Sequence, residues 1–401
     1  MKLIKLIFAA VVASLSAQAD ETRIPEPFRG STESSPIEVD YSDWSLILRN
    51  TVIGPKRSSR RASSLNSSKA APTGSRISRR NTSDTRNEGN RINLRELSSI
   101  ANIQMLTEIK ESLEKVPADA PLKLWRKQEQ LAYWLNIYNI TLIEQMAKEY
   151  PFRKLKKKKN AKDGIWARKT LNISGVALSL NDIQYTIIPN KWDTTLTIYG
   201  LYQGYIGGPS IQKQAFTGKN VHTLLNSSAR EFVNSNRGAK AKGKTLRVAK
   251  FYEENASLFP SWESDVKKHI LQISNRNIKA DIENTRKIKF LKTDYNTTDL
   301  YAGGKDAGTS QSNNSAALTF ATVGAGDTFG ASGEGGQNTI DGTTSMLDRL
   351  RDKTDGEHMN VGIPRAMREY ITNMRRQEMR RKGDVRIEVV DEPKPDNPDK
   401  K

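Results

Sequence analysis

The chain of 401 residues contains no cysteine and only three histidines, His222, His269 and His358. The absence of cysteine excludes disulfides, thiolate metal sites, a cysteine nucleophile and the lipid-carrying cysteine of a bacterial lipoprotein. The histidines show no HExxH pair or other close ligand spacing, so the sequence predicts neither a zinc site nor any other cofactor. His222 lies in a helical stretch one residue after Val221, and His269 follows Lys267-Lys268; we expect both to lie on the surface.

Apolar runs are scarce, and the longest one lies at the start of the chain. Met1–Lys5 carries two lysines, Leu6–Ser16 is apolar, and Ala17-Gln18-Ala19 forms a small-x-small cleavage site. This layout predicts a secretory signal peptide over residues 1–19, because the apolar run is shorter than the roughly 20 residues that span a bilayer. We therefore expect export to a bacterial periplasm or to the exterior, without a lipid anchor.

Charge is abundant but unevenly distributed: 64 Lys and Arg stand against 45 Asp and Glu, a net charge of +19. Gly54–Arg91, Arg153–Lys169 and Arg365–Lys382 carry the whole excess. Clustered basic charge is typical of places where anionic polymers or lipids dock. The candidate anion-binding residues are Lys154, Lys156, Lys157, Lys158, Lys159, Arg375 and Arg376. The expected partner is an anionic envelope component, such as lipopolysaccharide or an anionic lipid, or an acidic protein. We expect no nucleotide or nucleic acid, which an exported chain rarely meets.

Hydrophobic periodicity predicts helices before strands. The predicted helices are Glu38–Ile53, Asn93–Val116, Leu122–Tyr150 and Asn220–Asn234. The predicted strands are Trp166–Ile173, Val176–Leu178 after an Ile173-Ser174-Gly175 turn, and Asp193–Tyr202. Leu246–Tyr252 and Pro260–Ile273 complete the compact part. This order indicates an α+β fold, a single compact domain in which a small, mainly antiparallel sheet with further helices follows the first helices, with long disordered flanks.

Composition divides the remainder of the chain into further segments. The folded domain is predicted at 38–53 plus 92–297, and the Ser- and Arg-rich stretch 54–91 is predicted to be a disordered insertion, because it has almost no apolar side chains to bury. Residues 298–344 have linker composition, 345–382 form a basic helical segment, and 383–401 form a disordered tail.

Four collinear segments resemble the domain-of-unknown-function 547 family. Gln128–Pro151 resembles the family's "RLAFWINLYNAL" helix, and Ala177–Pro189 resembles its "SLDDIEHxIL" segment. Gly208–Asn234 resembles "CPPLRxxAYTxxNLDxQLxxAARxFLN", and Val248–Tyr252 resembles the start of "SxIFKWYxxDF". The order and spacing agree over about Asp40–Lys292, with 54–91 as an insertion after the first helix.

The resemblance implies that a thiol centre has been lost. A cysteine and histidines recur in the family's pattern and suggest a papain- or transglutaminase-like site. In this sequence, Tyr185 replaces the histidine of "IEH" and Ile198 replaces the histidine of "IHFALVCGAKSCPP". Gln203 and Gly208 replace that segment's two cysteines. Without thiolate or imidazole at these positions, catalysis by that route is not expected.

The framework around these positions is retained. Asn136 and Asn139 lie three residues apart on one predicted helix, so their amides project from the same face. These amides either satisfy backbone groups beside the Gly204–Ser210 loop or, with Tyr185 and Gln203, line a residual pocket that binds a polar ligand without turnover. Both interpretations remain open at the level of sequence.

Three functions compete. The preferred one is an exported, non-catalytic binding or scaffold protein of the bacterial envelope. The second is a hydrolase or transferase of papain- or transglutaminase-like descent that uses non-thiol residues, such as Ser210, Tyr185 or an Asp/Glu pair. The third is a protein whose Arg-rich helix, Pro364–Lys382, docks on an acidic protein or a membrane.

Overall fold

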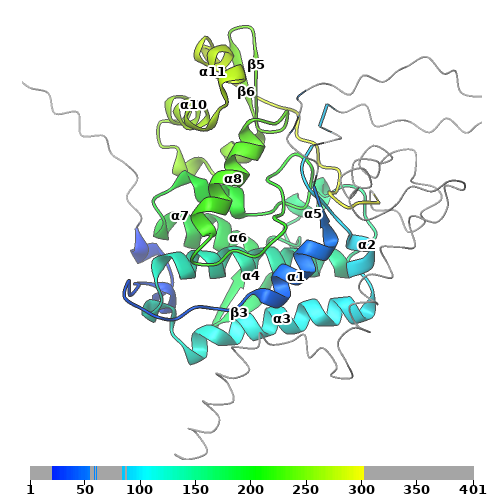
Figure 1. Cartoon of the computed structure of the whole chain (residues 1–401), viewed down its shortest axis with the longest axis vertical. Helices are drawn as coiled ribbons and strands as arrows, with labels where there is room; N and C mark the ends of the chain where they lie inside the picture. Colours follow the sequence, from blue (N-terminus) through cyan, green and yellow to red (C-terminus); the bar gives the residue numbers. More distant parts are fainter. Residues whose placement is uncertain (1–19, 55–57, 59, 61–83, 86–87, 302–401) are drawn as a thin grey trace, which may run out of the picture.

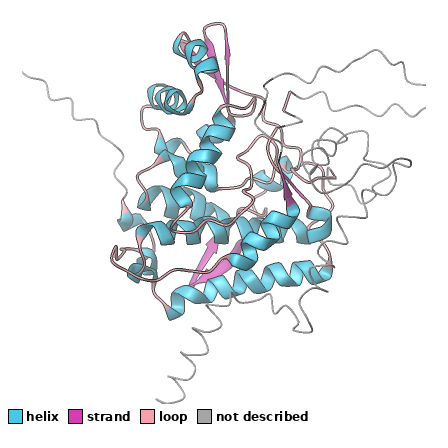
Figure 2. Cartoon of the chain, viewed as in Figure 1, coloured by secondary structure: helices cyan, strands magenta, loops and turns pink. Residues whose placement is uncertain are grey.

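The computed structural model describes residues 20–54, 58, 60, 84, 85 and 88–301. The predicted signal peptide, most of the basic insertion, and everything predicted from residue 302 onward lie outside the described residues. Arg375, Arg376, His358 and the Pro364–Lys382 helix are among them. The predicted α+β class is confirmed: helices dominate, and the strands are short (Figure 2).

The helices follow the predicted order. They are α1 (Ser42–Thr51), α2 (Leu94–Leu97), α3 (Ile100–Asp119), α4 (Lys127–Lys148), α5 (Lys156–Asn160), α6 (Leu180–Asp182), α7 (Ile188–Lys191), α8 (Val221–Val233), α9 (Lys250–Glu254), α10 (Trp262–Ile273) and α11 (Arg276–Glu283). A π-helical segment, η4 (Ile183–Ile187), joins α6 to α7. Short 3-10 helices occur at η1 (Glu21–Arg23), η2 (Glu26–Phe28), η3 (Leu122–Leu124), η5 (Thr195–Gly200) and η6 (Ala256–Leu258).

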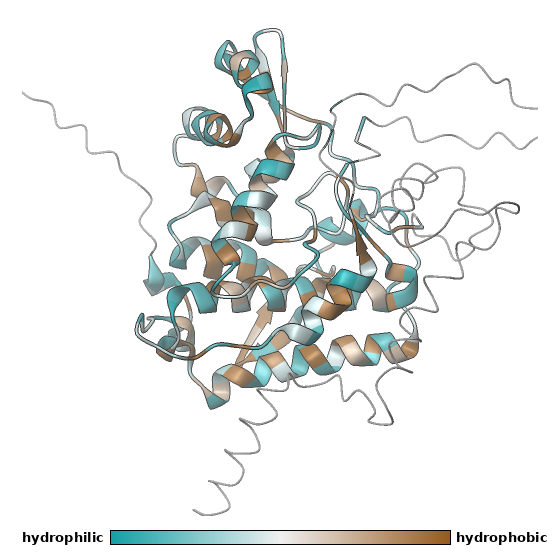
Figure 3. Cartoon of the chain, in the orientation of Figure 1, coloured by the Kyte–Doolittle hydropathy of each residue, from teal (hydrophilic) through white to brown (hydrophobic). Residues whose placement is uncertain are grey.

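Helix α4 forms the centre of the larger core. Every residue from Glu129 to Ala147 is buried, which is expected only of a helix that is covered on all sides. In Figure 1, α3 lies on one side of α4, and α8 lies on the other. The covering helices are amphipathic: apolar residues alternate with polar ones along α1 and α3 (Figure 3).

The strands form three small sheets, of which the first two are antiparallel pairs. β1 (Val52–Ile53) pairs with β2 (Arg91–Ile92), and β3 (Lys169–Ile173) pairs with β4 (Val176–Ser179). The β3–β4 hairpin confirms the predicted turn. Ser174 and Gly175 have φ angles of 49° and 80°, as a two-residue turn with two left-handed positions requires.

The third sheet belongs to a second apolar core. β5 (Ala239–Lys242) pairs antiparallel with β6 (Thr245–Val248), which pairs in parallel with β7 (Lys287–Phe290). This core is closed by α8, α9, α10 and α11, which contribute Phe232, Tyr252, Ile270 and Ile282. The sheet lies at the end of the molecule farthest from α3 (Figure 1).

The folded part extends beyond the predicted domain limits at both ends. Ile24 and Phe28 are buried, and the Phe28 ring packs edge-on against Trp134 at a centroid distance of 5.0 Å. At the other end, Asp299 and Leu300 are buried, a few residues past the predicted start of the linker. The backbone N–H of Leu300 donates to the carbonyl of Ile92 over 2.9 Å, which joins this end to β2.

One predicted strand is wrong, and one predicted helix is divided. Residues 193–202 contain three Thr and two Tyr, which favours a strand, but 195–200 form the 3-10 helix η5 against α8. The Thr194 hydroxyl accepts from the N–H of Leu196 over 3.3 Å, and this local cap supports the helical turn. The helix predicted at 93–116 is divided before α3, where the Ser99 hydroxyl caps the N–H of Asn102 over 3.3 Å.

Candidate functional site

The candidate site lies where α4 meets the chain segment 200–205. Asn139, on α4, holds this segment by two hydrogen bonds. Its Nδ2 donates to the carbonyl of Gly200 over 2.9 Å, and its Oδ1 accepts from the N–H of Tyr202 over 3.0 Å. Both bonds are buried, so the amide satisfies two backbone groups that otherwise have no water to bind. Asn139 therefore holds the backbone on both sides of Leu201, immediately before Gln203.

Asn136 has the same function one helical turn earlier, at a different loop. Its Nδ2 donates to the carbonyl of Phe216 over 2.7 Å, and its Oδ1 accepts from the N–H of Phe216 over 3.0 Å. Both asparagine amides are thus bonded to backbone on their oxygen and on their nitrogen. The geometry favours the first of the two sequence interpretations, in which these amides position loops.

Gln203 occupies the middle of a buried polar network. Its side chain is fully buried, and its Nε2 donates to the hydroxyl of Tyr138 over 3.1 Å, to Gln184 Oε1 over 3.3 Å and to the carbonyl of Leu201 over 3.1 Å. The Tyr138 hydroxyl in turn donates to Gln184 Oε1 over 3.1 Å and accepts from the Trp166 indole N–H over 3.2 Å. Burial raises the pKa of Tyr138 well above its usual 10, so the phenol is neutral.

Lys159 closes the network from the other side. Its Nζ donates to Gln203 Oε1 over 2.8 Å, to the Tyr205 hydroxyl over 3.0 Å and to Glu254 Oε2 over 2.8 Å. These three bonds use every N–H of the ammonium group. The Lys159 and Glu254 side chains are 9% and 17% exposed, so the ion pair is almost entirely shielded from water. Lys159 therefore links α5, the 200–205 segment and α9.

Tyr185 lies at the rim of this network. It is 39% exposed on η4, next to Gln184. Burial of the rest of the ring raises the pKa of Tyr185, an effect that the nearby Lys159 ammonium partly offsets. The structure thus brings Tyr185 and Gln203 to the two faces of one network, whereas Asn136 and Asn139 support loops beside it.

A known protein family matches the part of the chain that contains α4 and the 200–205 segment. Residues 122–233 match the family described as protein of unknown function, DUF547. The predicted family resemblance is confirmed. The match begins at η3, includes all of α4 and ends with α8, so it contains Asn136, Gln184 and Gln203. Neither curated proteins nor solved structures gave a match.

In the family resemblance described above, Gln203 takes the position of the first cysteine, and both ends of its amide are hydrogen-bonded within the protein. The histidine position of "IEH" is held by Tyr185, and that of the other segment by Ile198, which is buried in the second core. By this resemblance, an amide and a phenol stand where the family pattern has sulfur and imidazole. Lys159 is predicted only as one of several anion-binding lysines, because nothing in the sequence distinguishes it from the lysines around it.

The other predicted anion-binding lysines divide into paired and free side chains. The Lys158 ammonium bonds the Glu149 carboxylate, which also receives Arg168. Lys154, Lys156 and Lys157 are exposed, and Lys156 lies over the Tyr295 ring at 6.0 Å from its centroid. Two of the five predicted lysines are therefore already neutralised inside the fold.

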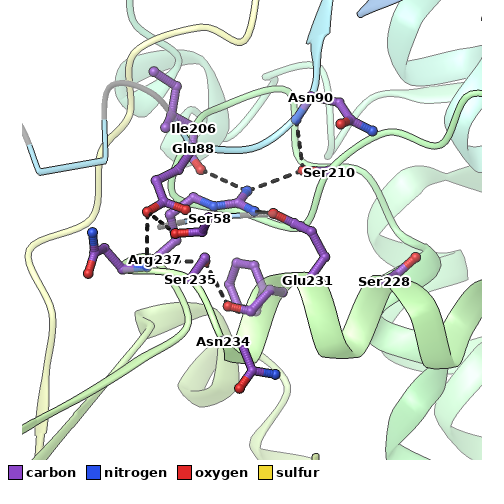
Figure 4. Close-up of polar contacts among 12 residues, drawn as sticks. Ser58, Glu88, Asn90, Ile206, Ser210, Ser228, Glu231, Asn234, Ser235 and Arg237 are labelled. Carbon is purple, nitrogen blue, oxygen red and sulfur yellow. Dashed lines mark hydrogen bonds and ion pairs between the residues drawn. The ribbon is translucent and has the colours of Figure 1, made fainter. Parts of the chain in front are cut away.

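Ser210, the candidate alternative nucleophile, lies in a different environment (Figure 4). The guanidinium of Arg237 donates to the carbonyl of Gly208 over 2.8 Å, to that of Ile206 over 3.3 Å and to the Ser210 hydroxyl over 3.3 Å. The Ser210 hydroxyl also accepts from the N–H of Asn90 over 3.1 Å. A guanidinium has only hydrogen-bond donors, so Arg237 positions this loop and supplies no acceptor that could serve Ser210 as a base.

The prediction for His269 is wrong, and that for His222 is confirmed. His222 is exposed on α8, but His269 is buried, with Nδ1 2.9 Å from the Thr195 hydroxyl and Nε2 2.7 Å from the Tyr199 hydroxyl. Its ring stacks on Tyr199 at a centroid distance of 5.7 Å. Burial lowers the pKa of His269 to about 4. The apolar side of α10 turns this residue inward, although two lysines precede it in the sequence.

Two features are absent from the part of the chain that the structure describes. No group of three or more His, Asp or Glu side chains there is arranged to hold a metal ion. Nor does any helix among those residues have the length and apolar character needed to cross a membrane.

Proposed function

We propose that the protein is an exported, non-catalytic binding or scaffold protein of the bacterial envelope that docks on anionic components. The signal-peptide pattern of residues 1–19 supports export. The exposed Lys154, Lys156 and Lys157 supply positive charge at the surface of the folded domain. Basic segments elsewhere in the sequence add to that charge.

The burial and hydrogen bonding of Gln203 support the non-catalytic part of the proposal. A catalytic group needs a lone pair or a proton that it can offer to a substrate. Gln203 is fully buried, and both its oxygen and its nitrogen are bonded within the protein. Lys159 has no spare donor, because its ammonium group bonds Gln203, Tyr205 and Glu254. The region therefore has the character of a side-chain-filled core.

One observation favours the enzymatic alternative. Tyr185 is partly exposed, and its phenol lies near Lys159 and Glu254, so a phenol, an ammonium and a carboxylate come together at the rim of the network. Such a group could serve a hydrolase or transferase that uses no thiol. The raised pKa of Tyr185 argues against a phenolate nucleophile at neutral pH.

Co-sedimentation tests the binding part of the proposal. The full chain is mixed with lipopolysaccharide aggregates, phosphatidylglycerol vesicles or phosphatidylcholine vesicles at low and high salt. Binding to an anionic preparation that weakens with salt supports the proposal, because screened charge–charge attraction is its basis. Absence of binding to both anionic preparations contradicts it.

A further inference from the structure

The β5–β6–β7 sheet has two faces of opposite character. Residues paired across neighbouring strands point to the same side of a sheet, so the register assigns each row of side chains to one face. Ala239, Val248 and Phe290 form one row, and Ala241, Leu246 and Ile288 form another. Most of these side chains belong to or pack against the second apolar core. They define the inner face, which α10 and α11 help to cover.

The outer face consists of the alternate rows, and these are almost entirely basic. One row is Lys240, Arg247 and Lys289, and the other is Lys242, Thr245 and Lys287. Five of the six side chains are cationic and none is acidic. Lys242, Arg247, Lys287 and Lys289 are exposed, and Lys240 is half-buried. We call this set of five cations the basic sheet face.

The positive charge of the basic sheet face is hardly neutralised by acidic side chains. Lys240 pairs with Asp84 at 3.5 Å, with both side chains about half exposed. Within the described part of the chain, the other four cations form no ion pair. Strands lie about 4.8 Å apart, so Lys240, Arg247 and Lys289 place three like charges side by side. Like charges directly opposite each other destabilise a sheet.

An extended layer of anions would relieve this repulsion. The cations are spread in two rows over three strands, so their charge covers an area and does not follow a line. The face carries no aromatic side chain on which a nucleic-acid base could stack. A flat layer of lipid phosphates matches both features, because it presents many negative groups over an area and requires no base recognition.

We propose that the basic sheet face is a docking surface for an anionic phospholipid bilayer, an inference that rests on the proposed envelope function. The lysine-rich segment at α5 was the surface expected from sequence, whereas this face is formed by pairing strands from 239–248 and 287–290. Docking here would place the β5–β6–β7 sheet against the lipid, at the end of the folded part opposite to α3 (Figure 1).

Vesicle binding by charge-matched variants of the full chain tests the proposal. Arg247→Gln/Lys289→Gln removes two neighbouring cations of one row. Lys115→Gln/Lys123→Gln removes the same charge from exposed positions on α3 and η3, away from the sheet. Each cation near an anionic surface contributes about fivefold to partitioning, so the sheet variant should bind phosphatidylglycerol vesicles about 30-fold more weakly. The control should remain within about threefold of the wild type, because its charges lie far from the proposed contact.

The possible outcomes separate this inference from the proposed function. If the wild type binds the vesicles and the sheet variant binds them equally well, the basic sheet face is not the docking surface. The same conclusion follows if both variants lose the same amount of affinity. Either result leaves the proposed envelope binding intact. Binding to lipopolysaccharide or single-stranded DNA without binding to phosphatidylglycerol vesicles would overturn the inference too, since the partner would be another polyanion. The thermal unfolding midpoints of both variants should match that of the wild type. If the midpoint of the sheet variant is lower, the single variant Arg247→Lys is measured as well. It keeps the positive charge and should bind the vesicles as the wild type does.

Discussion

Replacement of Lys159 by methionine tests whether the Gln203 network is a structural core. The substitution keeps a long side chain but removes the ammonium group that bonds Gln203, Tyr205 and Glu254 over 2.8, 3.0 and 2.8 Å. Gln203 Oε1 would become a buried acceptor without a donor. The Glu254 carboxylate would lose its cation while remaining only 17% exposed.

The expected loss of stability follows from these two defects. An unsatisfied buried acceptor costs about 1–3 kcal/mol, and removal of one partner from a fully buried ion pair costs about 3–5 kcal/mol. The second figure is reduced here because both side chains keep some contact with water. We therefore expect Lys159→Met to lower the free energy of unfolding by about 3 kcal/mol.

Urea denaturation of the wild type and two variants measures this effect. Lys157→Met is the matched control, since Lys157 lies on the same helix and is exposed, and it should change stability by less than about 0.5 kcal/mol. Adding Glu254→Gln to Lys159→Met should recover about 1 kcal/mol, because the carboxylate left without a partner is neutralised. If Lys159→Met is as stable as the Lys157→Met control, the network is not the structural core described here.

Two further predictions concern the buried polar groups. Asn139→Leu should lower the free energy of unfolding by about 2–4 kcal/mol, because the carbonyl of Gly200 and the N–H of Tyr202 lose their partners; a change below about 1 kcal/mol in urea denaturation would contradict its bracing role. Burial lowers the pKa of His269 to about 4, so the unfolded chain binds this proton more tightly than the folded protein. Its contribution to stability is complete above pH 6.5 and falls by about 3 kcal/mol between pH 6.5 and 4; equal pH dependence in wild type and His269→Gln would refute this assignment.

Sequence periodicity predicted the elements whose secondary structure has a local signal in the sequence. The α4 and α8 helices and the β3–β4 hairpin were confirmed, because continuous apolar spacing and turn chemistry act locally. The bracing function of Asn136 and Asn139 was one of two alternatives, since their spacing places them on one face without saying what they meet. Segment 193–202 was misassigned, because capping by Thr194 and packing against α8 prevailed over β propensity.

The features that depend on tertiary contacts were not predicted. Lys159 lies in a run of four lysines, and only the arrangement of α5 against α9 selects it for burial. The burial of His269 depends likewise on which side of α10 faces Tyr199. The basic sheet face is not evident from the charge of any one segment, because it combines strands from 239–248 and 287–290. The alternation of Lys240 with Lys242, and of Lys287 with Lys289, is its signal in the sequence, but the register is needed to combine the strands.

The central claim is that the region around Gln203 is a filled core without catalytic function. Its most direct test is turnover of peptide, ester and amide substrates by the purified full chain, measured beside a Tyr185→Phe/Gln203→Leu variant. The proposal predicts no turnover above the uncatalysed rate for either protein. Turnover by the wild type that disappears in the variant would contradict it and establish an enzyme that works without sulfur or imidazole at the family's positions.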